Sequence, residues 1–149
     1  MHLDQAQRFQ ADADTAGLSA ESRLILLHGA AISASNAILQ AAGLRVTTGE
    51  GAHLLRLETA LDQLDPDTEG LLERLDASRS RRNEASYAAM PVVQASVDEA
   101  REATVELIEL ARRFVGEPQT NNQRALTTYR VRRRKGFSPP DGSPRVALS

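Results

Sequence analysis

The scarcity of large aromatic side chains is the feature that most constrains how this chain can fold. Tryptophan is absent, and two tyrosines and three phenylalanines make up 3% of the 149 residues. A core without large rings must be built from Leu, Ala, Val and Ile, which favours packed helices over a β-sandwich. The length suits one domain, and a hydrophobic content of 41% suffices for one buried core. We therefore expect an all-α fold.

Apolar residues recur at intervals of three and four positions in four segments of the chain. The first segment covers 19–42 and is stopped by Gly43, which predicts a long, Ala-rich helix. The second begins at Thr48 or Gly49 and ends before the pair Asp65 and Pro66. An Asp followed by Pro is a favourable N-cap and first residue, so a third helix is expected to begin there.

The fourth periodic segment begins with Ser96 and Glu99, which form a capping-box pattern, and ends at Gly116 and Pro118. A weaker signal around residues 3–9 indicates a short N-terminal helix. Helices joined by short links, each with one apolar stripe, predict an up-and-down bundle of four to five helices. A leftover apolar face could also mediate a dimer, since a twofold pair is the commonest oligomer.

Charge is distributed unevenly along the chain. Residues 1–119 carry 11 Arg against 19 Asp and Glu, a balance of −8, whereas residues 120–149 carry seven Arg or Lys against one Asp, a balance of +6. We expect a helical domain over residues 1–117 and a basic, Pro/Gly-rich tail over 118–149. The tail residues Arg132, Arg133 and Arg134 suit attraction of RNA phosphates. The alternative is a solvated tail, or one docked on the acidic domain.

Several common kinds of site lack their sequence pattern. The chain has no Cys and no Gly-rich phosphate-binding loop, and its three His do not have the paired spacing of metal ligands, so we expect no metal and no cofactor. His28 lies in an apolar stripe and is interpreted as a packed core residue. His53 follows a Gly pair at a helix start and is either a binding or catalytic residue or a polar surface residue.

No segment has the features of a secretory signal peptide, and no window approaches the roughly 20 apolar residues that span a bilayer. We therefore expect a cytoplasmic protein without membrane association. Two carboxylate pairs, Glu58 with Asp62 and Glu69 with Glu73, are expected to be solvated charges on exposed helix faces.

Four arginines, an asparagine and a tyrosine are concentrated in one short segment: Arg74, Arg79, Arg81, Arg82, Asn83 and Tyr87. On a helix, three of these arginines are expected on overlapping faces. Guanidinium groups, an amide and a phenol gathered there would suit a bound phosphate and a stacked base. The alternative is a structural cluster in which Arg82 and Asn83 cap helix ends or pair with carboxylates such as Glu84.

Residues 82–87, Arg-Asn-Glu-Ala-Ser-Tyr, and the Val-Asp-Glu-Ala that opens the final predicted helix resemble the signature region of the HEPN superfamily (higher eukaryotes and prokaryotes nucleotide-binding domains). The loop over 45–53 also resembles that between early helices of many bacterial members. The resemblance covers about residues 18–115. It implies an α-helical bundle, often dimeric, in which an R-x(4–6)-H motif from each subunit faces the dimer cleft.

In its active members the motif makes a metal-independent endoribonuclease, often a toxin partnered with a nucleotidyltransferase antitoxin. Arg82 and Asn83 match the start of the motif, but Tyr87 stands at the His position. A phenol with a pKa near 10 is rarely ionised at neutral pH, unlike imidazole near 6.5, so the match favours the fold over catalysis.

Three functions follow from this reading. The first is an RNA- or nucleotide-binding protein of a toxin–antitoxin or defence system, with weak or lost ribonuclease activity. Its central residues would be Arg82 and Tyr87. The residues contributing to binding would be Arg79, Arg81, Asn83 and His53. The second is an active endoribonuclease toxin in which Tyr87 or His53 replaces the usual base. The third is a helical protein–protein interaction module.

Overall fold

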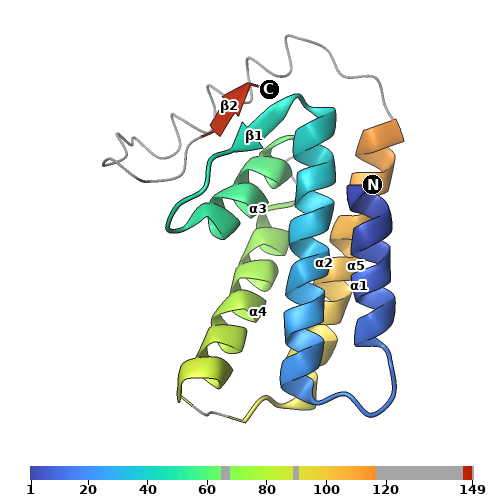
Figure 1. Cartoon of the computed structure of the whole chain (residues 1–149), viewed down its shortest axis with the longest axis vertical. Helices are drawn as coiled ribbons and strands as arrows, with labels where there is room; N and C mark the ends of the chain where they lie inside the picture. Colours follow the sequence, from blue (N-terminus) through green and yellow to red (C-terminus); the bar gives the residue numbers. More distant parts are fainter. Residues whose placement is uncertain (65–67, 89–90, 117–145, 149) are drawn as a thin grey trace.

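The computed structural model describes residues 1–64, 68–88, 91–116 and 146–148. These residues are mostly helical, as predicted, with one small two-stranded sheet (Figure 1). The elements in chain order are α1 (His2–Ala13), α2 (Ala20–Ala41), β1 (Leu44–Val46), α3 (Ala52–Asp62), α4 (Glu69–Ala88), α5 (Gln94–Gly116) and β2 (Val146–Leu148).

Helix α2 is the centre of the fold and packs against each of the other four helices. It begins where the sequence predicted, because the hydroxyl of Ser19 accepts a hydrogen bond from the backbone N–H of Ser22 at 3.1 Å. It ends before Gly43, whose φ of +70° is strained for residues with a side chain. Small buried residues along α2, including Ala30, Ala31 and Ala34, let its neighbours approach closely.

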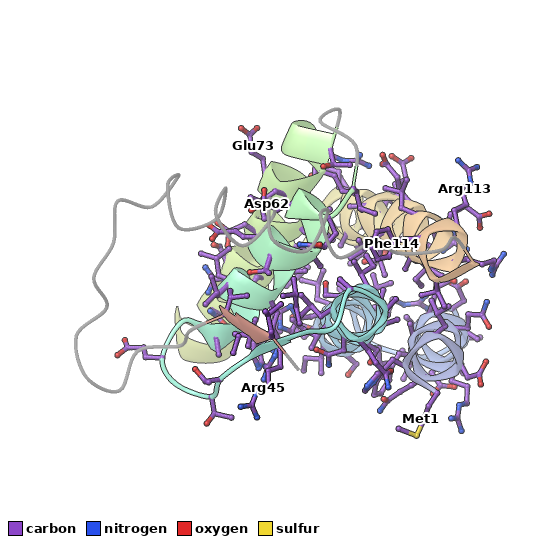
Figure 2. The ribbon with its side chains drawn as sticks, turned by 90° about the horizontal axis from the view of Figure 1, so that it is seen from above. Met1, Arg45, Asp62, Glu73, Arg113 and Phe114 are labelled. Atoms are coloured by element: carbon purple, nitrogen blue, oxygen red, sulfur yellow. The ribbon has the colours of Figure 1, made fainter. Side chains whose placement is uncertain are left out.

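The core consists of aliphatic side chains from α2, α3, α4 and α5, with few aromatic rings. Leu24, Leu27, Ile38, Leu57 and Leu107 are among its largest fully buried members. Figure 2 looks along the bundle axis: side chains fill the space between the helices, while charged residues such as Glu73 and Arg113 extend outward. The aliphatic core expected from the composition is therefore present.

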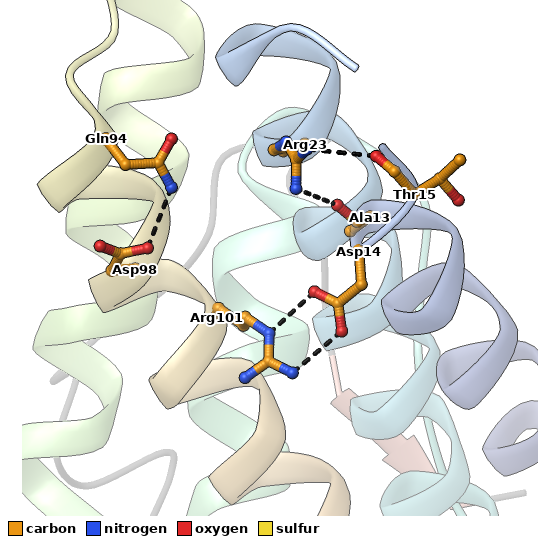
Figure 3. Close-up of polar contacts among 7 residues, drawn as sticks. All are labelled: Ala13, Asp14, Thr15, Arg23, Gln94, Asp98 and Arg101. Atoms are coloured by element: carbon orange, nitrogen blue, oxygen red, sulfur yellow. Dashed lines mark hydrogen bonds and ion pairs between the residues drawn. The ribbon is translucent and has the colours of Figure 1, made fainter. Parts of the chain in front are cut away.

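Two arginines attach the end of α1 to the rest of the fold (Figure 3). Arg23 of α2 donates to the backbone carbonyls of Ala13 and Thr15 at 3.0 and 3.1 Å. Arg101 of α5 forms a two-pronged ion pair with Asp14 at 2.8 and 2.9 Å. Backbone carbonyls at the end of a helix have no hydrogen-bond donor within the helix, and here Arg23 supplies the donors.

The predicted start of the last helix is wrong. Helix α5 begins at Gln94, two residues before Ser96, so Ser96 is not its N-cap. Both Ser96 and Val97 are buried, and Val97 packs in a small cluster with Leu24 and Leu27 of α2. Starting the helix earlier places these residues against α2, and this packing outweighs the capping-box pattern. The described part of α5 extends to Gly116, and residues beyond it, including Pro118, lie outside the described residues.

The two short strands were not foreseen, because three-residue segments show no alternating pattern. Leu44, Arg45 and Val46 of β1 pair antiparallel with Leu148, Ala147 and Val146 of β2. The last described residues of the predicted tail are thus hydrogen-bonded to the loop that leads into α3. The predicted boundary at 117/118 lies at the edge of the described residues.

One carboxylate pair departs from its predicted exposure. Asp62 is buried, with 9% of its surface exposed, and Glu58 is half-buried, because α3 packs on both α2 and α4 and presents little of its circumference to solvent. In the other pair, Glu73 is exposed as expected, and the side chain of Glu69 lies outside the described residues.

Helix α2 is long and apolar enough to cross a bilayer by length and composition alone, contrary to the expectation that no window would approach this limit. Its alanines add to the hydropathy of its Leu and Ile residues, and charged residues are few along the helix. Most of the helix is buried against its neighbours, which is also typical of the core helix of a globular domain.

Candidate functional site

Two histidines from different helices meet on one side of α2. His28 lies in the middle of α2 and is buried, with 7% of its surface exposed, as the sequence predicted. His53 is the second residue of α3 and is exposed. The loop after α2 turns the chain back through β1, so that the start of α3 comes beside the middle of α2.

The two imidazole rings are hydrogen-bonded to each other. Nε2 of His28 and Nδ1 of His53 are 3.2 Å apart, and the ring centroids are 5.4 Å apart with the planes tilted by 33°. An N···N contact of this length needs a proton on one nitrogen and a lone pair on the other. It is therefore compatible with two neutral rings and is lost if both rings are fully protonated.

Both histidines are held neutral by their surroundings. Burial, the positive charge of Arg82, the neighbouring His53 and the charge of Arg79 together lower the pKa of His28 to about 4. Burial and then the charges of Arg56, Arg82 and Arg79 lower the pKa of His53 below its usual value. At pH 7 the pair is thus an uncharged group surrounded by three guanidinium ions.

The arginines that act on this pair come from α3 and α4. Arg82 is half-buried, and its guanidinium donates to Oδ1 of Asn83 at 3.1 Å. Arg79 is also half-buried and pairs with Asp76 one turn earlier, at 2.8 Å. Among the described side chains, Arg82 has no carboxylate partner in a salt bridge.

The other arginines of the segment point away from the histidines. Arg74 contacts Glu106 of α5 at 2.7 Å, and Arg81 contacts Glu99 of α5 at 2.9 Å. Arg74 and Arg81 thus share the side of α4 that faces α5, whereas Arg82, which was expected to overlap with them, forms no hydrogen bond or ion pair with α5 among the described side chains. Helix α4 packs against α2 and α3 on one side and α5 on another, and its arginines divide between the two.

The start of α3 adds a further positive end to the site. Gly51 is the N-cap residue, with φ of +77°, and no side chain caps the helix start. The first amides of a helix without a side-chain cap attract anions, and the helix dipole acts in the same direction. His53 thus lies at a helix start, with Arg56 one turn further along.

Several predicted site residues are not brought to this cluster by the described structure. Tyr87 is the penultimate residue of α4, and its side chain lies outside the described residues. Arg132, Arg133 and Arg134 also lie outside them. Of the predicted site residues, His53 is part of the histidine pair, the charges of Arg79 and Arg82 act on it, and Asn83 contacts Arg82.

The described part of the chain includes one further place to look for a ligand. An open pocket of about 610 Å³ lies along α5, but Arg74 and Glu106 of its lining already pair with each other. No group of three or more His, Asp or Glu suited to a metal ion occurs within the described ranges. The histidine pair with its arginines is therefore the strongest candidate.

Sequence reasoning missed the contribution of His28, which it interpreted only as a packed residue. No spacing rule links His28 and His53, because they lie 25 positions apart on helices whose contact depends on the intervening turn. A polar residue in an otherwise apolar stripe was the one available signal.

Comparison with known proteins does not assign the chain. No family model matches it, and neither a curated protein nor a solved structure does so.

Proposed function

We propose that the chain is a HEPN-like protein that binds RNA or a nucleotide through phosphate contacts at the histidine pair. The observation that carries this proposal is the 3.2 Å contact between the rings of His28 and His53, two groups whose pKa values are lowered by burial and by positive charge that includes that of Arg82 and Arg79. Arginine forks match phosphate oxygens in geometry and charge.

The electrostatics of the cluster support an anion over a cation. Arg56, Arg79 and Arg82 all disfavour positive charge on the histidines, and the uncapped start of α3 acts in the same sense. The same charges would oppose a metal ion. Phosphate is the anion class that fits both the arginine cluster and the resemblance.

The test is retardation of a labelled, mixed-sequence single-stranded RNA by the purified protein, with a chelator present. Arg82→Ala is expected to weaken binding by about 1.5–3 kcal/mol, the range for a hydrogen bond to a charged group. Arg112→Ala is the matched control, because it removes one arginine that pairs with Glu109 on the exposed side of α5. Equal affinity of the two variants would refute the proposal.

Active, metal-independent endoribonuclease chemistry is a second candidate. It is favoured by the neutral, exposed His53 beside Arg82, since an imidazole can take a proton from a ribose 2′-hydroxyl. Cleavage would need a lone pair on Nε2 of His53. The same RNA samples report on this directly: cleavage that is lost in His53→Ala identifies the enzyme, and retardation without cleavage identifies the binding protein.

The resemblance also supplies the wider setting of the proposal. It includes a helical bundle that pairs as a homodimer and a nucleotidyltransferase antitoxin as partner. The charge distribution adds a basic tail over 118–149 that makes phosphate contacts, and the sequence without a signal-peptide pattern adds a cytoplasmic location. Light scattering of the purified chain tests the dimer. A protein–protein interaction module is the outcome if the chain neither retards nor cleaves RNA.

A further inference from the structure

The short strand β1 connects the two helices that carry the histidine pair. It lies between α2, which carries His28, and α3, which carries His53 (Figure 1). Residues 47–51 alone separate β1 from the start of α3. Strand β2 comes from far along the chain and pairs with β1 over all three of its residues. A distant segment is therefore bound to the stretch of chain that leads to His53.

One face of this small sheet is apolar and packs on the core. Residues opposite each other in an antiparallel pair project to the same face, and the face alternates along each strand. Val46 and Val146 are opposite each other, and both are partly buried against the main core cluster, to which Leu44 belongs. Arg45 and Ala147 project to the other face, where Arg45 is exposed. Strand β2 is therefore held by the packing of Val146 as well as by its pairing.

The segment between β1 and α3 has a permissive backbone. Gly49 and Gly51 both have positive φ, at +149° and +77°, and glycine is the residue least restricted in its backbone conformation. Gly51 is also the N-cap of α3 and has no side chain with which to cap it. The position of the first turn of α3 thus depends on what holds the two ends of this segment. These are β1 at one end and the packing of α3 on α2 at the other.

The contact between the histidines is sensitive to small displacements of that first turn. Nε2 of His28 and Nδ1 of His53 are 3.2 Å apart, and at about 3.6 Å such a contact is no longer a hydrogen bond. Ala52 and Leu55 are buried and keep α3 on the bundle. Loss of the strand pairing would therefore leave the helix in place and loosen the placement of its first turn.

We propose that β2 is a positioning strand: by pairing with β1 and packing Val146 on the core, it fixes the segment that leads into α3 and so holds His53 against His28. The inference rests on the proposed RNA or nucleotide binding, because it makes β2 a support of the phosphate site. It assigns a role in that site to a segment that lies outside the cluster of histidines and arginines.

Two variants that add the same charge at adjacent positions of β2 test this role. Val146→Asp places a carboxylate on the face that packs on the core, and should detach the strand. Ala147→Asp places it on the other face, opposite the exposed Arg45, where a cross-strand pair of opposite charges is favourable. It should leave the strand paired, and so it is the matched control.

Hydrogen exchange of the free proteins reports on the first turn of α3. The amide of Leu55 donates to the carbonyl of Gly51 at 3.1 Å. It should exchange at least about tenfold faster in Val146→Asp, the change expected when a valine is no longer buried, and at the wild-type rate in Ala147→Asp. Amides in the middle of α5 should keep their wild-type rates in both variants. Faster exchange throughout α5 in Val146→Asp would mean that β2 supports the whole fold, and would overturn the inference.

A second reading comes from the histidine rings themselves. We expect the pKa of His28, measured by NMR titration, to be higher in Val146→Asp than in Ala147→Asp, because a displaced His53 no longer covers the ring of His28. The two variants carry the same added charge, which the comparison cancels. Equal exchange rates at Leu55 and equal pKa values of His28 in the two variants would refute the positioning role.

Retardation of labelled RNA then connects the strand to the proposed function. Val146→Asp is expected to bind about three- to tenfold more weakly than Ala147→Asp, the range for one lost hydrogen bond. Equal affinities of the two variants would overturn the inference, with RNA binding itself intact. Failure of the wild-type protein to bind RNA would instead refute the proposed function, and the exchange rates and the pKa of His28 would still decide whether β2 positions His53.

Discussion

Acidification should destabilise this protein through His28. The pKa of His28 is lowered to about 4 in the folded chain, first by burial and then by Arg82, His53 and Arg79. In the unfolded chain it returns to about 6.5. Between these two values the unfolded state binds the proton and the folded state does not. Stability is therefore fully present above about pH 6.5 and falls as the pH decreases toward 4.

The size of the effect follows from the difference in pKa. A difference of about 2.5 units corresponds to about 3 kcal/mol when the pH lies below both values. At pH 5 the loss relative to pH 7.5 is about 2 kcal/mol. The free energy of unfolding of a typical domain is roughly 5–15 kcal/mol, so this loss is a large fraction of it.

The assay is urea unfolding followed by circular dichroism at several pH values from 7.5 to 4.5. His28→Gln removes the titrating group, and its unfolding free energy should depend less steeply on pH than that of the wild type in this window. The difference between the wild type and the variant cancels the contributions of all other groups to the pH dependence of unfolding. These include Asp14, whose lowered pKa affects stability at more acidic pH. Parallel pH profiles for the two proteins would contradict the burial of a neutral His28.

Three further substitutions, with Gly70→Ala as a control, test local features of the fold by the same unfolding measurement. Ser19→Ala removes the side-chain cap of α2 and should cost about 1 kcal/mol; no loss would mean that the bond to Ser22 is unimportant. Leu107→Ala empties a fully buried site and should cost about 2–5 kcal/mol, whereas a loss well below 1 kcal/mol would place Leu107 outside the core. In Gly51→Ala the added methyl group meets no atom within 4 Å, but the residue has φ of +77°, so backbone strain should lower the free energy of unfolding by about 1 kcal/mol. In Gly70→Ala the methyl group also meets no atom within 4 Å, and the residue lies in α4, so this variant should be neutral or more stable.

The sequence was most informative where local signals decide the structure. The 3–4 spacing of apolar residues, with Ser19 before it and Gly43 after it, was enough to locate α2 within a residue at each end. The same kind of signal failed at Ser96, where tertiary packing of Val97 moved the start of α5. A cap pattern is worth about 1 kcal/mol, and burying a large apolar side chain outweighs it.

Local sequence patterns could not predict which distant segments of the chain pair with each other. The strands β1 and β2 are three residues each and lie about a hundred positions apart, so neither has a recognisable signal by itself. The candidate site shows the same limit: Arg79, Arg82, Asn83 and His53 could be chosen by residue type, but their meeting with His28 depends on how α2, α3 and α4 pack. The division of the arginines between two faces of α4 likewise follows from that packing.

The most direct test of the central claim is an NMR titration of the wild-type protein with a short single-stranded RNA in the presence of a chelator. If the histidine pair and its arginines form the phosphate site, the ring signals of His53 and the guanidinium signal of Arg82 should shift progressively and saturate together. The signals of Arg112, on the exposed side of α5, should stay in place. Saturable shifts confined to residues other than His53 and Arg82 would contradict the account.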